Sequence, residues 1–343
     1  MKTISISMLL FLLISFGCKQ NKSPEIKNQS NKTATFALVI HGGAGYIKNL
    51  SPEKEKAYHD KLKEALQAGY RVLAQGRSAT EAVQKTINIM EDSPLFNAGK
   101  GCVLNSKGKP EMDASIMDGA TLNCGAVAGV SHIKNPINAA GLVKDSTRHV
   151  LLAGAGAEEF CKQYGIKMED ESYFITEKRL EQLRRIQAKE KQKETAMLPD
   201  EFNGIRKYGT VGCVALDKAG NIAAGTSTGG LMNKQYGRIG DSPIVGAGTY
   251  ADNQTCGISC TGTGEYFIRT AAAHTVSDLM QYKKLTLSEA QKLSIAKIEK
   301  LGGDGGMIGL DKQGNIAWFF NTEGMFRAYK KSTGEEVIKM YKN

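Results

Sequence analysis

Apolar positions near the start of the chain alternate between strand-like and helix-like spacing. Residues 35–40 form a β-branched, apolar run that predicts a buried strand. A helix is predicted over about 53–75, where apolar residues recur every three or four positions. The capping-box pattern at 78–81 begins a second helix, and the glycines of 96–101 predict a tight turn after it.

A β-hairpin is predicted around the turn sequence Asp-Lys-Ala-Gly-Asn at 217–221, which separates two apolar runs. If Leu216 pairs with Ile222, the antiparallel register places Thr210 opposite Thr228. The Cβ atoms of such a pair lie about 5 Å apart. The hairpin therefore brings two threonines together at one end.

The fold class follows from how hairpins and helices alternate. Residues 309–317 repeat most of the sequence of 215–223, which predicts a second hairpin. Helices are predicted between the two hairpins, after Glu265 and after the capping box at 286–289. A layered α+β domain is expected, and a doubly wound parallel sheet is not.

Charge adds little to this picture. The chain has 343 residues, 41% of them hydrophobic, and a formal net charge of +10. Much of the excess lies in residues 1–35 and 176–209, and no basic stripe is interleaved with aromatics, so no nucleic-acid partner is expected. The segment at about 176–208 is polar and predicts an exposed linker, either helical or disordered.

The N-terminus has the pattern of an export signal. Residues 1–17 contain a basic residue and a short apolar run, and end just before Cys18. This resembles a bacterial lipoprotein signal, with Cys18 as the lipidation site and 18–34 as a polar tether. The expectation is an exported bacterial protein that reaches the membrane only through its lipid anchor. Plain secretion with cleavage nearby is the alternative.

The remaining cysteines and the histidines do not form a metal motif. There is no Cys-x-x-Cys, and the five histidines lack metal-ligand spacing, so zinc is not expected. Cys213 lies in an apolar strand and predicts a buried free thiol. Whether disulfides form is left open for the six cysteines after Cys18: Cys102, Cys124, Cys161, Cys213, Cys256 and Cys260.

Three clusters after the linker carry candidate chemistry. Thr210 stands where the linker meets an apolar strand. Arg238 and Asp241 offer a guanidinium and a carboxylate three residues apart, which suits a zwitterion. The glycine-rich turn at 261–265 leads into a helix N-terminus, where backbone N–H groups can bind an oxyanion. Each feature alone is common in structural roles.

Together with further motifs, these clusters are much more specific. The chain from about Ala37 to about Lys330 resembles the plant-type asparaginase/isoaspartyl peptidase family of N-terminal nucleophile (Ntn) hydrolases. The motifs that carry the resemblance are His41-Gly-Gly-Ala-Gly45, Asn97-Ala-Gly-Lys-Gly101, Asp113-Ala-Ser-Ile-Met-Asp-Gly119, Gly209-Thr-Val-Gly212, Thr226-Ser-Thr-Gly-Gly230, Gly237-Arg-Ile-Gly-Asp-Ser-Pro243, Cys260-Thr-Gly-Thr-Gly-Glu265 and Gly302-Gly-Asp-Gly-Gly306.

The resemblance implies a four-layer αββα sandwich formed by a single domain, residues 35–343. It also implies self-cleavage between Gly209 and Thr210, giving a large chain that ends at 209 and a small chain of residues 210–343. Two such cleaved heterodimers are implied to associate as a dimer. Tyr208, where family members often have histidine, departs from the pattern next to the cleavage site.

The resemblance also implies the catalytic residues. Thr210 is the implied nucleophile, and Thr228 assists it. Thr261 and Gly262 are implied to form the oxyanion hole, and Asn97 lies near the nucleophile. Cleavage would free the α-amine of Thr210, which can then act as the base that activates the hydroxyl.

Binding roles are carried over in the same way. Arg238 is implied to hold the substrate α-carboxylate, and Asp241 and Gly264 its α-amino group. No cofactor is required for the chemistry, but a structural sodium ion is implied. Its implied ligands are the backbone carbonyls of Met90, Glu91, Ser93, Phe96, Ala98 and Lys100.

The implied activity is hydrolysis of β-aspartyl dipeptides and L-asparagine, which are small-molecule substrates, with release of aspartate. One alternative is a glycosylasparaginase that cleaves glycan-linked asparagine. The other is a surface lipoprotein that binds aspartyl ligands without turning them over. The sequence does not rank the three substrates.

Overall fold

The computed structural model describes residues 35–194 and 209–342, which belong to one compact unit. The predicted signal segment, the tether, Cys18 and Tyr208 lie outside the described residues.

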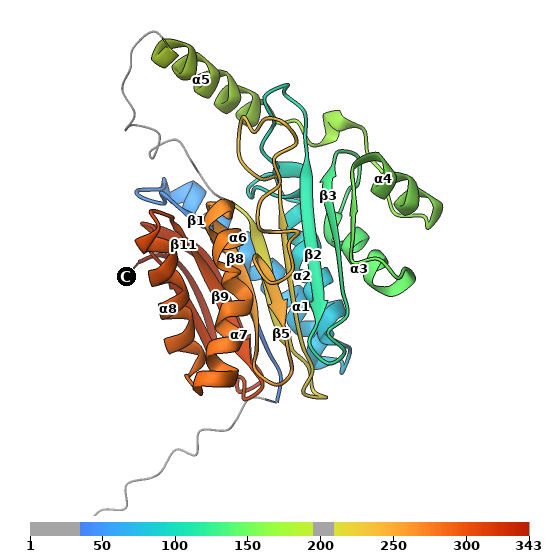
Figure 1. Ribbon diagram of the computed structural model, residues 1–343, viewed down its shortest axis with the longest axis vertical. Helices are drawn as coiled ribbons and strands as arrows, with labels where there is room; N and C mark the ends of the chain where they lie inside the picture. Colours follow the sequence, from blue (N-terminus) through green and yellow to red (C-terminus); the bar gives the residue numbers. More distant parts are fainter. Residues whose placement is uncertain (1–34, 195–208, 343) are drawn as a thin grey trace, which may run out of the picture. The chain divides into compact units, whose positions relative to one another are not determined.

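The larger of two β-sheets has eight strands in the order β12-β11-β1-β5-β6-β2-β3-β4 (Figure 1). Its neighbours are antiparallel except for β3 and β4, which are parallel. The N-terminal strand β1 therefore lies beside β5, the strand that follows the predicted cleavage site. The bounds are Ala37–Gly45 (β1), Met112–Asp118 (β2), Cys124–Val130 (β3), Leu151–Ala153 (β4), Val211–Leu216 (β5), Ile222–Thr228 (β6), Gly324–Lys331 (β11) and Glu336–Tyr341 (β12).

The smaller sheet has four antiparallel strands in the order β10-β9-β8-β7. One face of it packs on the larger sheet through a buried apolar cluster that includes Val39, Val214, Ile308 and Leu310. Burial of these side chains supplies the main attraction between the sheets. The bounds are Thr249–Ala251 (β7), Cys256–Gly262 (β8), Gly305–Asp311 (β9) and Ile316–Phe320 (β10).

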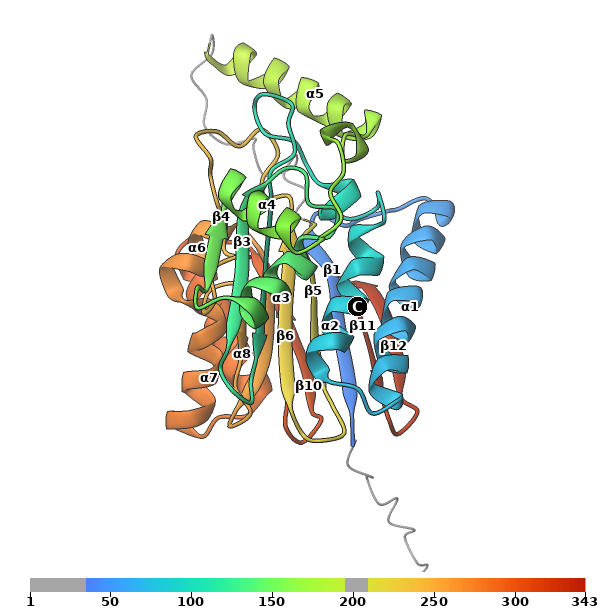
Figure 2. The same cartoon turned by 90° about the vertical axis from the view of Figure 1, so that its right-hand side faces the viewer.

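Helices cover the two sheets from opposite sides (Figures 1 and 2). Helices α1, α2 and α3 pack on the larger sheet, and α6, α7 and α8 lie with the smaller one. The expected mixed α+β architecture, with two sheets, is confirmed. The bounds are Pro52–Ala74 (α1), Ala79–Glu91 (α2), Pro136–Ser146 (α3), Gly154–Gln163 (α4), Glu177–Glu194 (α5), Gly264–Thr270 (α6), Ala272–Lys283 (α7) and Leu287–Lys300 (α8), with short 3₁₀ helices at Gly99–Gly101 (η1) and Glu171–Tyr173 (η2).

The hairpin predictions and one of the two capping-box predictions are confirmed. At 78–81 only half of the box forms, because the Glu81 N–H donates to Ser78 Oγ whereas the Glu81 carboxylate pairs with Arg77. Leu216 pairs with Ile222 in the β5–β6 hairpin, and the second hairpin forms between β9 and β10. Thr286 and Glu289 make both hydrogen bonds of a capping box at the start of α8. The first strand is longer than predicted. β1 continues through Gly45, where it still pairs with β11, and the pairing register shifts between His41 and Gly43.

The segment expected to be an exposed linker forms helix α5 as far as Glu194. Arg179 and Leu183 are buried near its start. The Arg179 Nε donates to the Gly101 carbonyl over 2.8 Å, and burial lowers the pKa of this guanidinium. The beginning of α5 is therefore anchored to the loop that follows Asn97.

Candidate active site

Two buried threonines meet at the end of the β5–β6 hairpin. The Thr210 hydroxyl donates to Thr228 Oγ1 over 3.0 Å, as the predicted register requires. The Gly230 N–H donates to the same Thr228 oxygen over 3.0 Å. Thr228 is thus oriented by the turn after β6, and its oxygen in turn fixes the rotamer of Thr210.

Asn97 ties the predicted cleavage site to this turn. Its backbone N–H donates to the Gly209 carbonyl over 3.0 Å, and its own carbonyl accepts from the Gly229 N–H. The Asn97 side chain donates from Nδ2 to the Gly230 carbonyl and accepts from the Val103 N–H, each over 2.8 Å. A donor therefore already contacts the carbonyl that precedes Thr210.

The glycine motif of β1, residues 41–45, packs against Gly209 at the predicted cleavage site. Gly43 has φ +106°, and a Cβ there would lie 2.5 Å from Gly209 Cα. Only glycine allows this conformation and this approach. The next residue, Ala44, donates its N–H to Thr261 Oγ1 over 3.3 Å. Thr261, near the end of β8 in the other sheet, is thereby bonded to the part of β1 that lies against Gly209.

The residues expected to bind substrate are also assembled. Arg238 donates from Nε and Nη2 to the two carboxylate oxygens of Glu265, over 2.9 and 2.8 Å. A Cβ on Gly264 would lie 2.8 Å from Asp241 Oδ1 and 3.0 Å from Arg238 Nη2. Arg238 and Asp241 therefore both lie against Gly264, and the Arg238 side chain is held by a partner that sequence reasoning missed.

Asp241 is buried, and its Oδ2 has no hydrogen-bond partner among the described residues. Burial raises the pKa of Asp241 to about 6, although the nearby Arg238 guanidinium opposes the rise. A buried carboxylate with a free oxygen is suited to accept hydrogen bonds from an ammonium group.

Two further charged residues near the site were missed from the sequence. Asp113 on β2 pairs with Thr228 in the sheet and accepts from the Gly129 N–H over 2.8 Å. Burial raises the pKa of Asp113. The Lys234 side chain is also buried and donates to the Glu111 carbonyl over 2.7 Å. The sequence signal for Asp113 was a carboxylate within an otherwise uncharged start of a strand.

The loop implied to bind sodium passes directly beside the site. A Cβ on Gly99 would lie 2.3 Å from the Glu91 carbonyl oxygen, and one on Gly101 would lie 2.1 Å from the Phe96 carbonyl oxygen. The glycines therefore leave room for these two carbonyl oxygens. The Glu91 side chain is buried behind β6, where it accepts from Ser227 Oγ over 2.7 Å, and burial raises the pKa of Glu91 to about 8.

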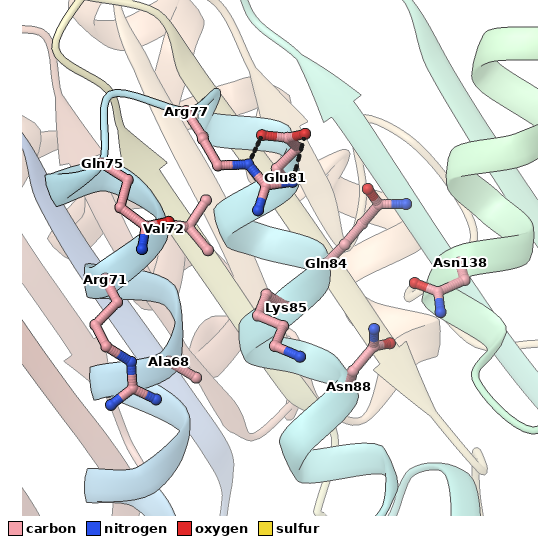
Figure 3. Close-up of a pocket in the computed structure, with 10 residues that line it drawn as sticks. All are labelled: Ala68, Arg71, Val72, Gln75, Arg77, Glu81, Gln84, Lys85, Asn88 and Asn138. Carbon is pink, nitrogen blue, oxygen red and sulfur yellow. Dashed lines mark hydrogen bonds and ion pairs between the residues drawn. The ribbon is translucent and has the colours of Figure 1, made fainter.

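A separate groove of about 520 Å³ lies between helices α1 and α2, which cover the larger sheet (Figure 3). It is formed mainly by α1 and α2, with polar side chains such as Arg71, Lys85 and Asn88 on its walls. Arg77 in this groove is paired with Glu81. None of the predicted catalytic or substrate-binding residues lines it, so this groove is not the active-site candidate.

The chain has clear relatives among known proteins. The family model described as asparaginase matches residues 34–339. The chain is 47% identical over 296 residues to an isoaspartyl peptidase of Salmonella typhimurium, covering 85% of this chain and 94% of the relative. It is 43% identical over 307 residues to a plant-type L-asparaginase of Pyrococcus horikoshii, covering 88% and 98%. A Danio rerio isoaspartyl peptidase/L-asparaginase is 41% identical over 290 residues, covering 83% and 89%.

The expected location is contradicted by these findings. The relatives are named as peptidases and asparaginases, and the family match starts only at residue 34. Within 35–194 and 209–342, no helix is long and apolar enough to cross a membrane. The prediction of an exported, membrane-anchored lipoprotein is contradicted by the enzymes to which the chain is related, and the lipoprotein and signal-peptide assignments are not supported.

Proposed function

Because the chain belongs to the asparaginase family of amidohydrolases, we propose that it hydrolyses β-aspartyl dipeptides and L-asparagine with Thr210 as nucleophile. The observation that carries this assignment is the 3.0 Å hydrogen bond between the buried hydroxyls of Thr210 and Thr228. A threonine hydroxyl is a weak nucleophile unless a neighbouring base takes its proton. The proposal therefore depends on how Thr210 acquires such a base.

Self-cleavage would supply it. Hydrolysis of the bond between Gly209 and Thr210 gives a new carboxylate on Gly209 and a free α-amine on Thr210. An unperturbed α-amine has a pKa of about 8, so about a tenth of it is the free base at pH 7 and can accept a proton. The Asn97 N–H that donates to the Gly209 carbonyl supports the cleavage step, since it stabilises charge that develops on this oxygen.

The same groups account for turnover. The Thr210 hydroxyl attacks the side-chain carbonyl of the aspartyl group, and its proton passes to the α-amine. Thr261 and Gly262 are assigned to the oxyanion, and each donor is worth about 3 kcal/mol in the barrier. The amine or ammonia then leaves with a proton, and water hydrolyses the acyl-enzyme to release aspartate.

Substrate recognition is assigned to the cluster around Arg238. Its guanidinium would bind the α-carboxylate, while Asp241 and the Gly264 carbonyl would bind the α-ammonium group. The placement of Arg238 and Asp241 against Gly264 supports this assignment, because a zwitterion needs both charges within one small site.

We also propose that the 90–100 loop holds a structural sodium ion. Hard cations prefer oxygen ligands. The carbonyl oxygens of Glu91 and Phe96, beside glycines that leave them room, fit that preference. Met90, Ser93, Ala98 and Lys100 would complete the carbonyl set. The role assigned to the ion is to stiffen the loop that carries Asn97.

The architecture proposed for the mature enzyme is the four-layer αββα sandwich of Ntn hydrolases, cleaved into two chains and associated as a dimer of cleaved heterodimers. The packing of separate helix groups on the two sheets supports the layer order.

Mass spectrometry of the purified protein after denaturation tests the cleavage. Size-exclusion chromatography with light scattering tests the assembly.

Turnover of L-asparagine, a β-aspartyl dipeptide and a glycosylated asparagine tests the activity. Release of aspartate from the first two supports the proposal. Release from the glycosylated substrate alone would identify a glycosylasparaginase. Cleaved protein that binds aspartate but turns over none of the three would reject the enzymatic role.

A further inference from the structure

A second row of polar side chains lies directly behind the threonine pair. Residues on neighbouring strands that are paired in register project to the same face of a sheet, and so do residues two apart on one strand. His41, Gly212, Thr226 and Ser115 are paired in sequence across β1, β5, β6 and β2. On each of the strands β5, β6 and β2, this row lies two residues further along than Thr210, Thr228 and Asp113, and so on the same face of the sheet. It faces the smaller sheet, which contributes the paired residues Ser259 and Thr249.

These side chains form a continuous row of close polar contacts, named here the polar layer. At one end, His41 Nδ1 lies 3.1 Å from the Thr210 carbonyl oxygen, and His41 Nε2 lies 2.9 Å from Ser259 Oγ. Thr226 Oγ1 contacts Ser259 Oγ over 2.7 Å. Every member is fully or almost fully buried. The polar layer consists of His41, Ser259, Thr226, Thr249 and Ser115.

The other end of the polar layer reaches the substrate-binding segment. Thr249 Oγ1 donates to Thr226 Oγ1 over 2.6 Å. Ser115 Oγ lies 2.8 Å from Thr249 Oγ1 and 2.6 Å from the Ser242 carbonyl oxygen. Ser242 directly follows Asp241. The polar layer thus connects the main chain of Thr210 to the main chain beside Asp241.

The direction of the first two bonds is fixed. A carbonyl oxygen only accepts, so His41 Nδ1 must carry the hydrogen that bonds to Thr210. Burial lowers the pKa of His41 to about 3, which keeps the ring neutral. Nε2 is then an acceptor, and Ser259 must donate to it. The Thr210 carbonyl therefore sets the tautomer of His41, and the Ser259 hydroxyl holds the other side of the ring.

Gly212 leaves the space in which this bond forms. A Cβ on Gly212 would lie 2.0 Å from Ser259 Oγ and 2.3 Å from His41 Nε2. The glycine that follows Thr210 by two positions is therefore part of the same arrangement.

We propose that the polar layer positions both halves of the active site, with His41 and Ser259 holding Thr210 and with Ser115 holding the segment of Asp241. The inference rests on the proposed function, because it takes Thr210 as the nucleophile and Asp241 as a substrate ligand. After cleavage Thr210 becomes a chain end, and chain ends fray unless they are tied down. β5 begins only at Val211, so the His41 bond holds the first carbonyl of the new chain.

Single hydroxyl deletions test the two ends separately. Ser259→Ala should slow self-cleavage and lower kcat about tenfold with little change in KM, since small displacements of reacting groups are costly. Ser115→Ala should raise KM about fivefold and leave the rate of self-cleavage unchanged, the effect of one neutral hydrogen bond. Each variant is assayed with a β-aspartyl dipeptide, and its Tm is measured.

Thr255→Val is the matched control. Its hydroxyl is also buried and contacts Ser277 Oγ over 2.6 Å, between the β7–β8 turn and α7. It should lower Tm as much as the other two variants but change neither kcat, KM nor self-cleavage. Thr226→Ser, which keeps the central hydroxyl, should be close to wild type, whereas Thr226→Val should show both kinetic defects.

The outcomes separate the two proposals. If Ser259→Ala and Ser115→Ala match Thr255→Val in kinetics, the polar layer has only a structural role and the inference is rejected, while the proposed function stands. If the wild-type protein neither cleaves before Thr210 nor releases aspartate, the proposed function itself is rejected.

Discussion

The Thr210 hydroxyl donates to Thr228 over 3.0 Å, from the residue before β5 to the last residue of β6. This contact is local in the chain, since a single hairpin separates the two threonines. It gives Thr210 a fixed rotamer next to the Gly209 carbonyl, which Asn97 contacts from another loop.

Thr210→Ala should remain one uncleaved chain without activity, because the methyl side chain has no oxygen to attack the Gly209 carbonyl. Intact-mass measurement after denaturation shows whether a small chain is present. Thr210→Ser, which keeps a hydroxyl, should still be processed and is the control. A small chain whose first residue is not Thr210 would contradict the assignment of the nucleophile.

Arg238→Ala should mature normally but lose about 100-fold or more in kcat/KM, because the substrate carboxylate would be left without its cation. The scissile bond of the precursor presents no such carboxylate, so processing should be spared. Arg269→Ala, an exposed arginine of α6 that contacts the Tyr266 ring, is the control. Wild-type kcat/KM in Arg238→Ala would show that the α-carboxylate binds elsewhere.

Protonation of the Thr210 α-amine, whose unperturbed pKa is about 8, should already lower activity near neutral pH, and the fall should steepen below about pH 6. Burial raises the pKa of Asp241 to about 6, so this carboxyl gains a proton in that range and can no longer bind an ammonium group as an anion. Profiles of kcat/KM against pH check this, and a profile that stays flat down to pH 5 would contradict it.

The same shift predicts the effect of Asp241 on stability. The folded protein holds the proton more tightly than the unfolded chain, whose aspartates titrate near pH 4. The fold therefore loses stability progressively between about pH 4 and about pH 6, and the loss stays constant above that range. Asp241→Asn should raise Tm at pH 7 more than at pH 4, and an equal change at both pH values would argue against the shift.

Thiol labelling should report the packing of the domain. The six cysteines in the described residues are free, and all but Cys124 are buried. Burial raises the pKa of Cys102 to about 12 and of Cys161 to about 11, so the reactive thiolate is scarce. In the native protein Cys124 should react first, and Cys124→Ser should remove this fast phase. Rapid labelling of Cys102 or Cys161 would contradict the core described here.

The sequence by itself determined the parts of this protein whose chemistry is local. The turn residues at 217–221 place Leu216 opposite Ile222, and that register is enough to bring Thr210 to Thr228. The capping box at Thr286 likewise depends on residues three positions apart. The order of the motifs was sufficient to indicate the family and its activity.

Only the tertiary structure decided the contacts between segments that are distant in the chain. The pairing of Arg238 with Glu265 and the polar layer from His41 to Ser115 join several different elements. Nothing local specifies them, because each depends on which strands lie side by side and how the two sheets are stacked. The N-terminal pattern shows where a local reading fails. A short apolar segment suggested a location for the protein that the relatives of the folded domain contradict. Local patterns determine local geometry, whereas an active site built from several strands is determined by long-range packing.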